Sequence, residues 1–458
     1  MASNPFTVII VGAGFAGVTA AIECRLRGMR VLLVETYPTS KKYGDIIDFF
    51  PNGGKIIQKW AGGRIARNLM AVCINQGDRF QYYKYDGKLI FDEPWILKPH
   101  HFWQQYAGHR GQMHDVILDY AKELGVELRF GVKVVDYFES ENEAGVVTDK
   151  GDKFVGDVVL AADGPRSLAR QKVLHLPDTK VNSGYAIYRA YYTLTEEHRK
   201  NPLLAEFCNP NRDITKMWVA KDLHMIIYTW MKGKEIGWVL THKDDHDIGE
   251  SWSFPGDKKD VLKCLEEEGF EEKLKEVVKY TPADSLVDYK LVWRDPVKTW
   301  LSSGKRIAVI GDAAHCHLPT SAQGGSQAME DGVAAAVALH RAKGDAKLGL
   351  QVFERIRFNR SHVVHMSSIS NRDGYHNVDF DGEEIQKHPE ILNMPRFKWV
   401  LEHDAEKNAE EHFDHLAADV RSGRQGTLEE LSVPAGGGFE IEDRRYSDEA
   451  EVPVRANL

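Results

Sequence analysis

The sequence predicts a mixed α/β (α+β) chain, in which a parallel sheet is interrupted by an inserted antiparallel sheet and followed by a helical C-terminal segment. Three observations support this fold class. A strand, a helix and a strand open the chain at residues 7–35. Two further buried strands, at 157–162 and 306–310, each end beside a glycine and an aspartate. Between them, residues 181–295 change to short alternating runs rich in Tyr, Trp, Val and Ile. Continuous apolar strands are typical of parallel sheets and alternating ones of antiparallel sheets.

The composition bounds the class of protein. With 458 residues, of which 43% are apolar and 28% charged, the chain is long enough for two or three globular domains. Its 59 basic and 68 acidic residues leave a net charge of −9, which disfavours nucleic acid as a partner. No apolar run approaches the roughly 20 residues of a membrane span, and no secretory signal opens the chain, so we expect a cytoplasmic protein. Its five cysteines form no Cys-x-x-Cys pair and are expected to be reduced thiols.

The first strand, residues 7–11, leads into a glycine-rich turn. Gly12, Gly14 and Gly17 have G-x-G-x-x-G spacing, and Glu35 closes the second strand. Such a turn lets backbone amides approach a pyrophosphate at a helix N-terminus, and an acidic residue about 20 positions later accepts from a ribose hydroxyl. The turn therefore predicts a Rossmann-like dinucleotide site, without choosing between NAD and FAD.

The remaining elements are predicted in chain order. A hairpin turns at Asp86-Gly87, and the strands near 157–162 and 306–310 end at Asp163-Gly164 and Gly311-Asp312. These carboxylates lie where open α/β sheets bind ligands, so a nucleotide that reaches several strand ends must be long. Helical patterns are predicted at residues 114–125, 326–343 and 404–418. The last 25 residues have few apolar side chains to bury.

These elements group into three predicted regions, of which the first is discontinuous. They are a nucleotide-binding domain at 1–78, 100–180 and 290–370, a substrate-binding sheet domain at 79–99 and 181–289, and a C-terminal helical or extended segment at 371–458.

Three motifs in order carry a family resemblance. They read VIIVGAGFAGVTAAIE at 8–23, AADGPRSLAR at 161–170 and GDAAHCHLPTSAQGGSQAMEDG at 311–332. The chain resembles the class A, single-component FAD-dependent aromatic monooxygenases, specifically their fungal salicylate hydroxylase-like subgroup. One departure is Ala322, since many members have Gly before the Gln-Gly pair.

The resemblance implies FAD as cofactor and NADPH or NADH as co-substrate. It implies that Gly12, Gly14, Gly17 and Glu35 hold the ADP half of FAD. The flavin side is implied to involve residues of the second and third motifs together with an arginine that lies between the first and second: Asp163, Asp312, Gly324, Gly325 and Arg110. In such a cycle the reduced flavin adds O2, and the C4a-hydroperoxide passes one oxygen to an aromatic carbon. The glycine-started helix from 326 would aim its dipole at the flavin.

Three residues are candidates for substrate chemistry. By resemblance, Arg189 lies on a strand close to the flavin, where it would bind a phenolate or carboxylate or donate a proton; the alternative is an arginine on an exposed sheet face. Tyr228 matches a tyrosine that holds substrate, although a strand tyrosine is more often a packing residue. Asp45 is a weaker acid/base candidate. His315 and His317 lack convincing further ligands, so no metal site is expected.

The implied function is hydroxylation of a small aromatic, phenolic or polyketide-derived substrate with O2 in secondary metabolism, by a monomer or homodimer. Three alternatives stay open. The enzyme could epoxidise or hydroxylate an indole alkaloid, act as a flavin oxidase or dehydrogenase without oxygen insertion, or be a non-enzymatic binding protein.

Overall fold

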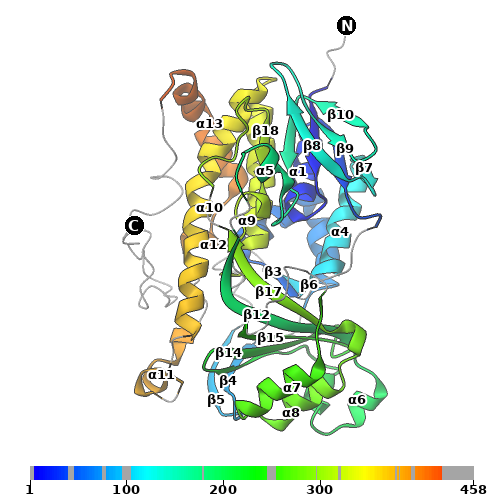
Figure 1. Cartoon of the computed structure of the whole chain (residues 1–458), viewed down its shortest axis with the longest axis vertical. Coiled ribbons are helices and arrows are strands. Elements are labelled where there is room, and N and C mark those ends of the chain that lie inside the picture. The colour runs from blue at the N-terminus through cyan, green and yellow to red at the C-terminus, as the bar shows by residue number, and fades with distance from the viewer. Residues whose placement is uncertain are drawn as a thin grey trace.

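The computed structural model describes residues 5–39, 46–74, 79–94, 105–177, 180–244, 254–294, 297–317, 321–376, 379–380, 382–392 and 398–424. A helix-covered parallel sheet lies at one end of the molecule and a broad antiparallel sheet at the other (Figure 1). A small two-stranded sheet, β3 (Ile46–Phe49) with β6 (Tyr106–His109), lies between them.

The parallel sheet has five strands in the order β18, β11, β1, β2, β7. Their bounds are Ile307–Val309, Val158–Ala161, Thr7–Val11, Arg30–Glu35 and Glu127–Phe130. All neighbours run parallel. Val11 pairs with Ala161, which pairs in turn with Val309, so the chain segments that follow these three strands emerge side by side at one edge.

Helices cover this sheet because its strands are apolar on both faces. Helix α1 (Phe15–Leu26) packs on α9 (Gly324–Arg341), and both belong to one large buried core with the strands. Further elements complete this end of the molecule: α2 (Pro51–Lys59), η1 (Trp60–Gly63), α3 (Arg64–Met70), α4 (Arg110–Glu123), α5 (Leu168–Lys172), η4 (Gly311–Ala313), and the antiparallel strands β8 (Val134–Glu139), β9 (Ala144–Thr148) and β10 (Lys153–Gly156).

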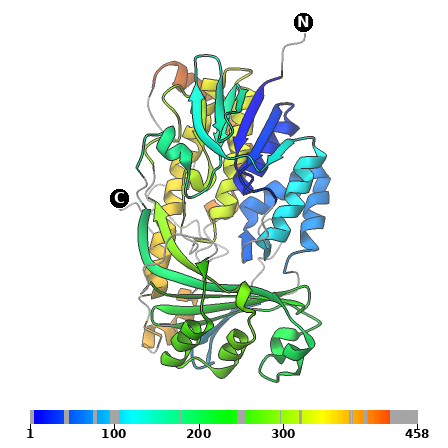
Figure 2. The same cartoon turned by 45° about the vertical axis from the view of Figure 1, so that its right-hand side comes forward.

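The second sheet has eight strands, in the order β16, β17, β12, β15, β14, β13, β4, β5. Their bounds are Phe254–Pro255, Val287–Arg294, Lys180–Thr193, Glu235–Lys243, Leu223–Trp230, Thr215–Ala220, Arg79–Lys84 and Leu89–Pro94. Every pairing is antiparallel except that of β13 with β4. Helices α7 (Lys258–Glu267) and α8 (Glu272–Lys279) cover its outer face, and α6 (Glu196–Lys200), η2 (Ala205–Cys208) and η3 (Ala283–Ser285) lie in its connections (Figure 2).

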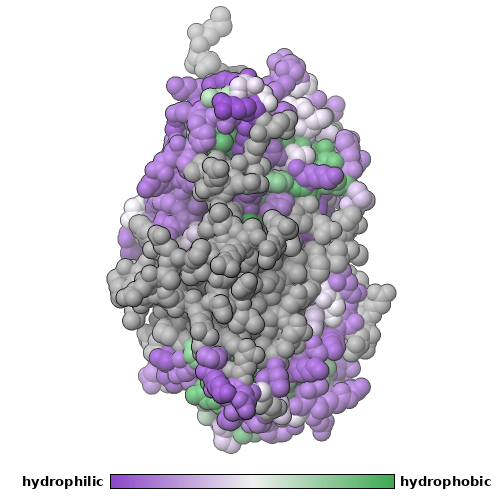
Figure 3. All heavy atoms as spheres, turned by 90° about the vertical axis from the view of Figure 1, so that its left-hand side faces the viewer, coloured by the Kyte–Doolittle hydropathy of each residue, from purple (hydrophilic) through white to green (hydrophobic). Residues whose placement is uncertain are grey.

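The C-terminal helices run along one side of the molecule. Helix α10 (Ala346–His376) and α13 (Ala405–Arg421) pack on α9, with α11 (Glu383–Lys387), η6 (Pro389–Leu392) and α12 (Lys398–Leu401) between them in the chain. Viewed from this side (Figure 3), the described residues at both ends of the molecule are mostly hydrophilic. None of the helices in the described ranges is long and apolar enough to cross a bilayer.

The predicted fold class is confirmed, and most predicted elements match within a few residues. The helix expected from residue 114 instead begins at Arg110, because His109 caps it and accepts from the backbone N–H of Gln112 at 3.4 Å. All five cysteines are free thiols. The domain bounds stay a prediction; β4 and β5 pair into the sheet of β12–β17, and α10 continues through residue 370.

Candidate active site

The glycine turn joins β1 to α1. Gly12 has φ +101°, and a Cβ there would lie 2.3 Å from the carbonyl oxygen of Ala162. A Cβ on Gly17 would lie 2.0 Å from the carbonyl oxygen of Gly12, whereas a Cβ on Gly14 would meet nothing within 4 Å. Gly12 and Gly17 are thus required by packing, while Gly14 borders open space at the N-terminus of α1. That terminus has no side-chain cap, so its amides are available to an anion.

Two side chains hold the turn in place. The Glu35 carboxylate, at the end of β2, accepts from the backbone N–H groups of Ala13 at 2.8 Å and Tyr37 at 3.0 Å. On the other side, His114 of α4 donates through Nε2 to the carbonyl oxygen of Ala13 at 2.6 Å. Burial lowers the pKa of His114, which keeps the imidazole neutral and suited to this bond. His114 was not among the sequence-predicted residues.

Asp163 follows β11 at the same sheet edge. Its Oδ2 accepts from the hydroxyl of Tyr137 and the N–H of Ala169, both at 3.1 Å. Its Oδ1 is buried and has no hydrogen-bond partner among the described residues. Burial raises the pKa of this carboxyl, against the lowering effect of its hydrogen bonds. A buried, unsatisfied oxygen at this edge is what a ligand hydroxyl or amide would satisfy.

Asp312 lies on η4, directly after β18. Burial raises its pKa, while His315 and Arg110 favour its charged form. The guanidinium carbon of Arg110, at the start of α4, lies 5.6 Å from the ring centre of Phe15 in α1. The structure therefore brings the sequence-predicted residues Arg110 and Asp312 into one electrostatic neighbourhood beside the first turn of α1.

Helix α9 begins at Gly324 with no side-chain cap. A Cβ on Gly324 would meet nothing within 4 Å, and one on Gly325 would lie 3.0 Å from Ile47 in β3. Ala322, the departure from the family motif, has φ +49°. Ala322 thus adopts the left-handed conformation that favours glycine, and its methyl group packs against Phe50 and Leu401.

These features fit the dinucleotide that the sequence predicts. Two helix N-termini without side-chain caps, open space beside Gly14 and Gly324, and the unpaired oxygen of Asp163 all occur where the parallel strands end. Helix N-termini attract phosphate groups and other anions. The residues at this edge therefore suit FAD.

On the other side of the site, Arg189 lies in the middle of β12, paired with Val239 and Val287. The side chain is 6% exposed, so it is not on an exposed sheet face. Its guanidinium carbon lies 5.8 Å from the ring centre of Tyr289. Strand alternation puts Arg189 on the face of Tyr191, opposite the face that α7 and α8 cover.

That inner face is aromatic and looks toward β3 and β6 (Figure 1). Tyr191 stacks on His109 at 4.3 Å between ring centres and on Trp230 at 4.8 Å. His109 immediately precedes Arg110, so the stack joins the sheet to the start of α4. This contact positions β12, which carries Arg189, relative to the edge of the parallel sheet where β1, β11 and β18 end, here called the nucleotide edge.

Tyr228 is fully buried in the same layer. Its hydroxyl accepts from the backbone N–H of Ile46 at 2.8 Å, and Gly237 faces its ring so closely that a Cβ there would lie 2.6 Å away. Tyr228 thus has a packing role, and its predicted contact with substrate stays a prediction. Asp45 lies outside the described residues.

A buried charge network that the sequence reading missed lies behind α9. Glu330 accepts from Asn52 at 2.6 Å and from Nε of Arg360 at 2.8 Å, and it also pairs with Arg357. Arg357 donates through Nε to Asp331 at 2.8 Å. The signal was present in the third motif, where two adjacent carboxylates stand in an otherwise small and apolar helix and must find buried partners.

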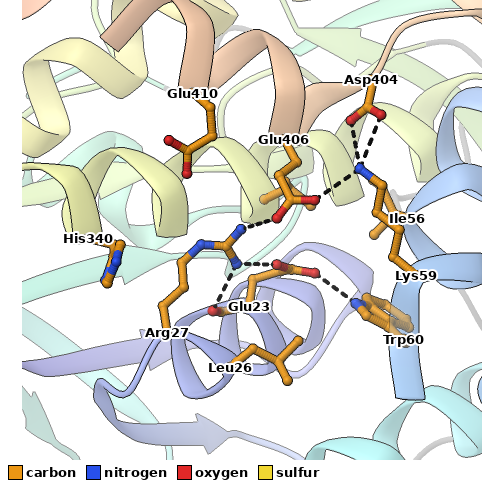
Figure 4. A pocket seen from close by; sticks show the side chains of 11 residues that line it. Glu23, Leu26, Arg27, Ile56, Lys59, Trp60, His340, Asp404, Glu406 and Glu410 are labelled. Atoms are coloured by element: carbon orange, nitrogen blue, oxygen red, sulfur yellow. Dashed lines mark hydrogen bonds and ion pairs between the residues drawn. The ribbon is translucent and has the colours of Figure 1, made fainter. Parts of the chain in front are cut away.

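A cavity of about 370 Å³ lies elsewhere, between α1, α2, α9 and α13 (Figure 4). Arg27 pairs with Glu23 and with Glu406 at 2.6 Å, and Lys59 pairs with Asp404 and Glu406, both at 2.9 Å. Glu23 and Arg27 lie at the C-terminal end of α1, opposite the glycine turn. These ion pairs attach α13 to α1 and α2, away from the nucleotide edge.

Comparison with known proteins identifies the family. Residues 97–357 match a family model described as an FAD binding domain, and residues 7–41 match a second with the same description. "FAD-dependent monooxygenase nanF" of Aspergillus nanangensis is 32% identical over 446 residues, covering 96% of this chain and 95% of the relative. "Asperlicin C monooxygenase" of Petromyces alliaceus is 30% identical over 92% of this chain and 90% of its own.

Solved structures agree. The crystal structure of CtdE in complex with FAD and substrate 4 has a TM-score of 0.85 and 31% identity, covering 91% of this chain and all of that chain. A salicylate hydroxylase substrate complex shares the fold, with a TM-score of 0.71 at 23% identity and coverage of 90% and 98%. With matches that span nearly the whole chain on both sides, this chain belongs to the FAD-dependent monooxygenases.

Proposed function

We propose that this enzyme uses NAD(P)H and O2 to hydroxylate a small aromatic substrate, phenolic or polyketide-derived, in secondary metabolism. The observation that carries the proposal is Arg189, a buried guanidinium on an aromatic sheet face that looks toward the nucleotide edge. A buried guanidinium can bind an anionic or strongly accepting group, and a phenolate or carboxylate on an aromatic ring is such a group.

Within this proposal, FAD supplies the redox chemistry when bound, taking a hydride from NAD(P)H and activating O2. The first and second strands hold its ADP half through Gly12, Gly14, Gly17 and Glu35. The flavin side is held by residues at the other strand ends and helix starts: Arg110, Asp163, Asp312, Gly324 and Gly325. Both half-sites belong to the nucleotide-binding domain predicted from the sequence.

The substrate side has two tasks. Arg189 orients the ring through its ionised or hydrogen-bonding substituent, and the aromatic layer of Tyr191 and Tyr289 excludes water from the reacting centre. The ring system of an indole alkaloid would also pack against this aromatic layer. The phenolic substrate and the alkaloid substrate therefore differ mainly in size.

The test is oxygen incorporation by the FAD-loaded enzyme. With ¹⁸O2, NADPH or NADH, and a panel of phenols, aromatic acids and indoles, we expect one ¹⁸O atom in the product for each NAD(P)H consumed. A labelled indole product would replace the phenolic reading with the alkaloid one. Hydrogen peroxide release with unlabelled products throughout the panel would make the enzyme an oxidase and overturn the proposal.

A variant links the result to Arg189. Arg189→Met should keep bound FAD yet lower product formation by about 100-fold or more, because the substrate loses its charged partner. Arg189→Lys is the matched control and should recover part of the rate, since it keeps the charge but not the planar fork.

A further inference from the structure

The buried carboxylate of Asp331 in α9 ties down the turn that follows β18. Its Oδ2 accepts from the backbone N–H of Gly311 at 2.8 Å and from Nε2 of His315 at 2.6 Å. One oxygen atom thus joins both ends of the segment 311–315. The other oxygen accepts from Nε of Arg357 at 2.8 Å, which fixes the carboxylate from behind.

This five-residue turn is packed as well as bonded. The N–H groups of Ala314 and His315 both donate to the carbonyl oxygen of Gly311, at 2.8 and 2.9 Å. A Cβ on Gly311, which has φ +60°, would lie 2.7 Å from the Cβ of Ala16 in α1. The turn is therefore held between α1 and α9, and its second residue is Asp312.

Electrostatics favour the same arrangement. Although burial opposes ionisation, the interactions with His315 and Arg357 lower the pKa of Asp331. Asp331 is therefore an anion, and an anion accepts stronger hydrogen bonds than a neutral group. None of these contacts requires Asp331 itself to touch a ligand.

We propose that Asp331 is a positioning residue for FAD: by clamping the 311–315 turn, it sets the place of Asp312 and thereby the affinity for the flavin half of the cofactor. This inference rests on the role proposed above for Asp312. It assigns to Asp331 no contact with the ADP half, which the glycine turn holds at the end of β1.

The test separates the two halves of the cofactor by measuring dissociation constants for FAD and for ADP on the apoprotein. Asparagine has the shape of aspartate, but its Nδ2 donates and therefore cannot accept from Arg357 while Oδ1 serves the turn. Asp331→Asn should raise the FAD dissociation constant about tenfold or more. The ADP dissociation constant should stay within about twofold of wild type.

Glu330→Gln is the matched control. Glu330 is the adjacent buried carboxylate and pairs with the same Arg357, but no bond from it to the 311–315 turn is found in the described structure. It should lower the urea midpoint of the apoprotein as Asp331→Asn does, with FAD affinity within about twofold of wild type. His315→Ala removes one of the two hydrogen bonds between Asp331 and the 311–315 turn but leaves the charge on α9 in place. If Asp331→Asn does not fold, the FAD affinity of His315→Ala tests whether this clamp sets cofactor binding.

A double-mutant cycle with Asp312→Ala completes the test. Because Asp331 acts through Asp312, Asp312→Ala/Asp331→Asn should bind FAD no more weakly than Asp312→Ala alone. Unchanged FAD affinity in Asp331→Asn, equal weakening of ADP, or additive losses in the double variant would each overturn the inference. Wild-type FAD affinity in Asp312→Ala would instead reject the role proposed for Asp312.

Discussion

Gly14→Ala separates cofactor binding from folding. At φ −72° and ψ −178° the backbone of Gly14 suits any residue, and its added Cβ would meet nothing within 4 Å. Alanine stiffens the unfolded chain but is a poorer N-cap than glycine, and these effects oppose each other, so the free energy of unfolding of the apoprotein should change by less than about 0.5 kcal/mol.

FAD binding should respond far more strongly. The methyl group would occupy the open space beside the N-terminus of α1, where we propose that a phosphate of FAD approaches the backbone amides. Loss of one hydrogen bond to a charged group costs about 1.5–3 kcal/mol, which corresponds to a rise of about 10- to 100-fold in the FAD dissociation constant. FAD titration of the apoprotein, followed by quenching of flavin fluorescence, measures this change.

Gly17→Ala is the contrasting variant. Its Cβ would lie 2.0 Å from the carbonyl oxygen of Gly12, so the fold itself must shift, at a cost of about 1–3 kcal/mol or more in unfolding free energy. Urea unfolding of both apoproteins gives the comparison. If Gly14→Ala binds FAD like wild type, or loses as much stability as Gly17→Ala, the assignment of the open space to the pyrophosphate is refuted.

Three further predictions concern stability. Burial lowers the pKa of His365 to about 4. Between pH 6.5 and 4 the imidazole binds a proton in the unfolded chain but not in the folded one, so the free energy of unfolding falls as the pH falls. His365→Leu should reduce this pH dependence by about one proton, or about 1.4 kcal/mol per pH unit. Tyr228→Phe leaves the N–H of Ile46 without its acceptor and should lower the unfolding free energy by about 1 kcal/mol. Arg360→Met leaves Glu330 with one buried arginine fewer and should cost about 3–5 kcal/mol, with faster limited proteolysis of the C-terminal helices.

Urea unfolding, repeated at pH 7 and pH 5 for His365→Leu, measures all three. Parallel pH profiles for wild type and His365→Leu would show that this imidazole is not buried as neutral. Unchanged stability in Tyr228→Phe would mean that its hydroxyl is dispensable for packing. A protease-resistant Arg360→Met protein would contradict the role of Arg360, whose guanidinium also donates to the carbonyl oxygen of Val400 at 2.9 Å, in attaching the C-terminal segment.

Local signals were enough to predict the strand-ends at the nucleotide edge. Each of the three runs is short and apolar and ends beside a glycine, and two of them also end beside a carboxylate, Asp163 or Asp312; such runs are readable without tertiary knowledge. The three runs proved to be neighbouring strands of one sheet. Residues 79–84 could be predicted as a hairpin strand. Their parallel pairing with residues 215–220 could not, because the local pattern of a strand does not reveal a partner strand so far away in the sequence.

The supporting residues of the site were harder to predict. His114 and Tyr137 act through contacts with Ala13 and Asp163, respectively, and nothing in their own sequence neighbourhood marks such partners. Asp331 stood within a quoted motif, yet its role depends on the fold bringing α9 against the turn after β18. The pairing of Arg360 with Glu330 likewise joins two helices whose relative placement only packing decides.

The strand order of the parallel sheet also constrains synthesis of the protein. Strand β1 leaves the ribosome first, but its partner β11 follows about 150 residues later, and Asp312 comes later still. Until then one edge of β1 has no partner strand, and the segments proposed to hold the flavin side have not been synthesised. Because FAD stabilises only a chain that can bind it, the cofactor cannot assist the early stages of folding. Incomplete chains that end before α9 therefore expose apolar strands that the complete chain buries, and such surfaces favour aggregation.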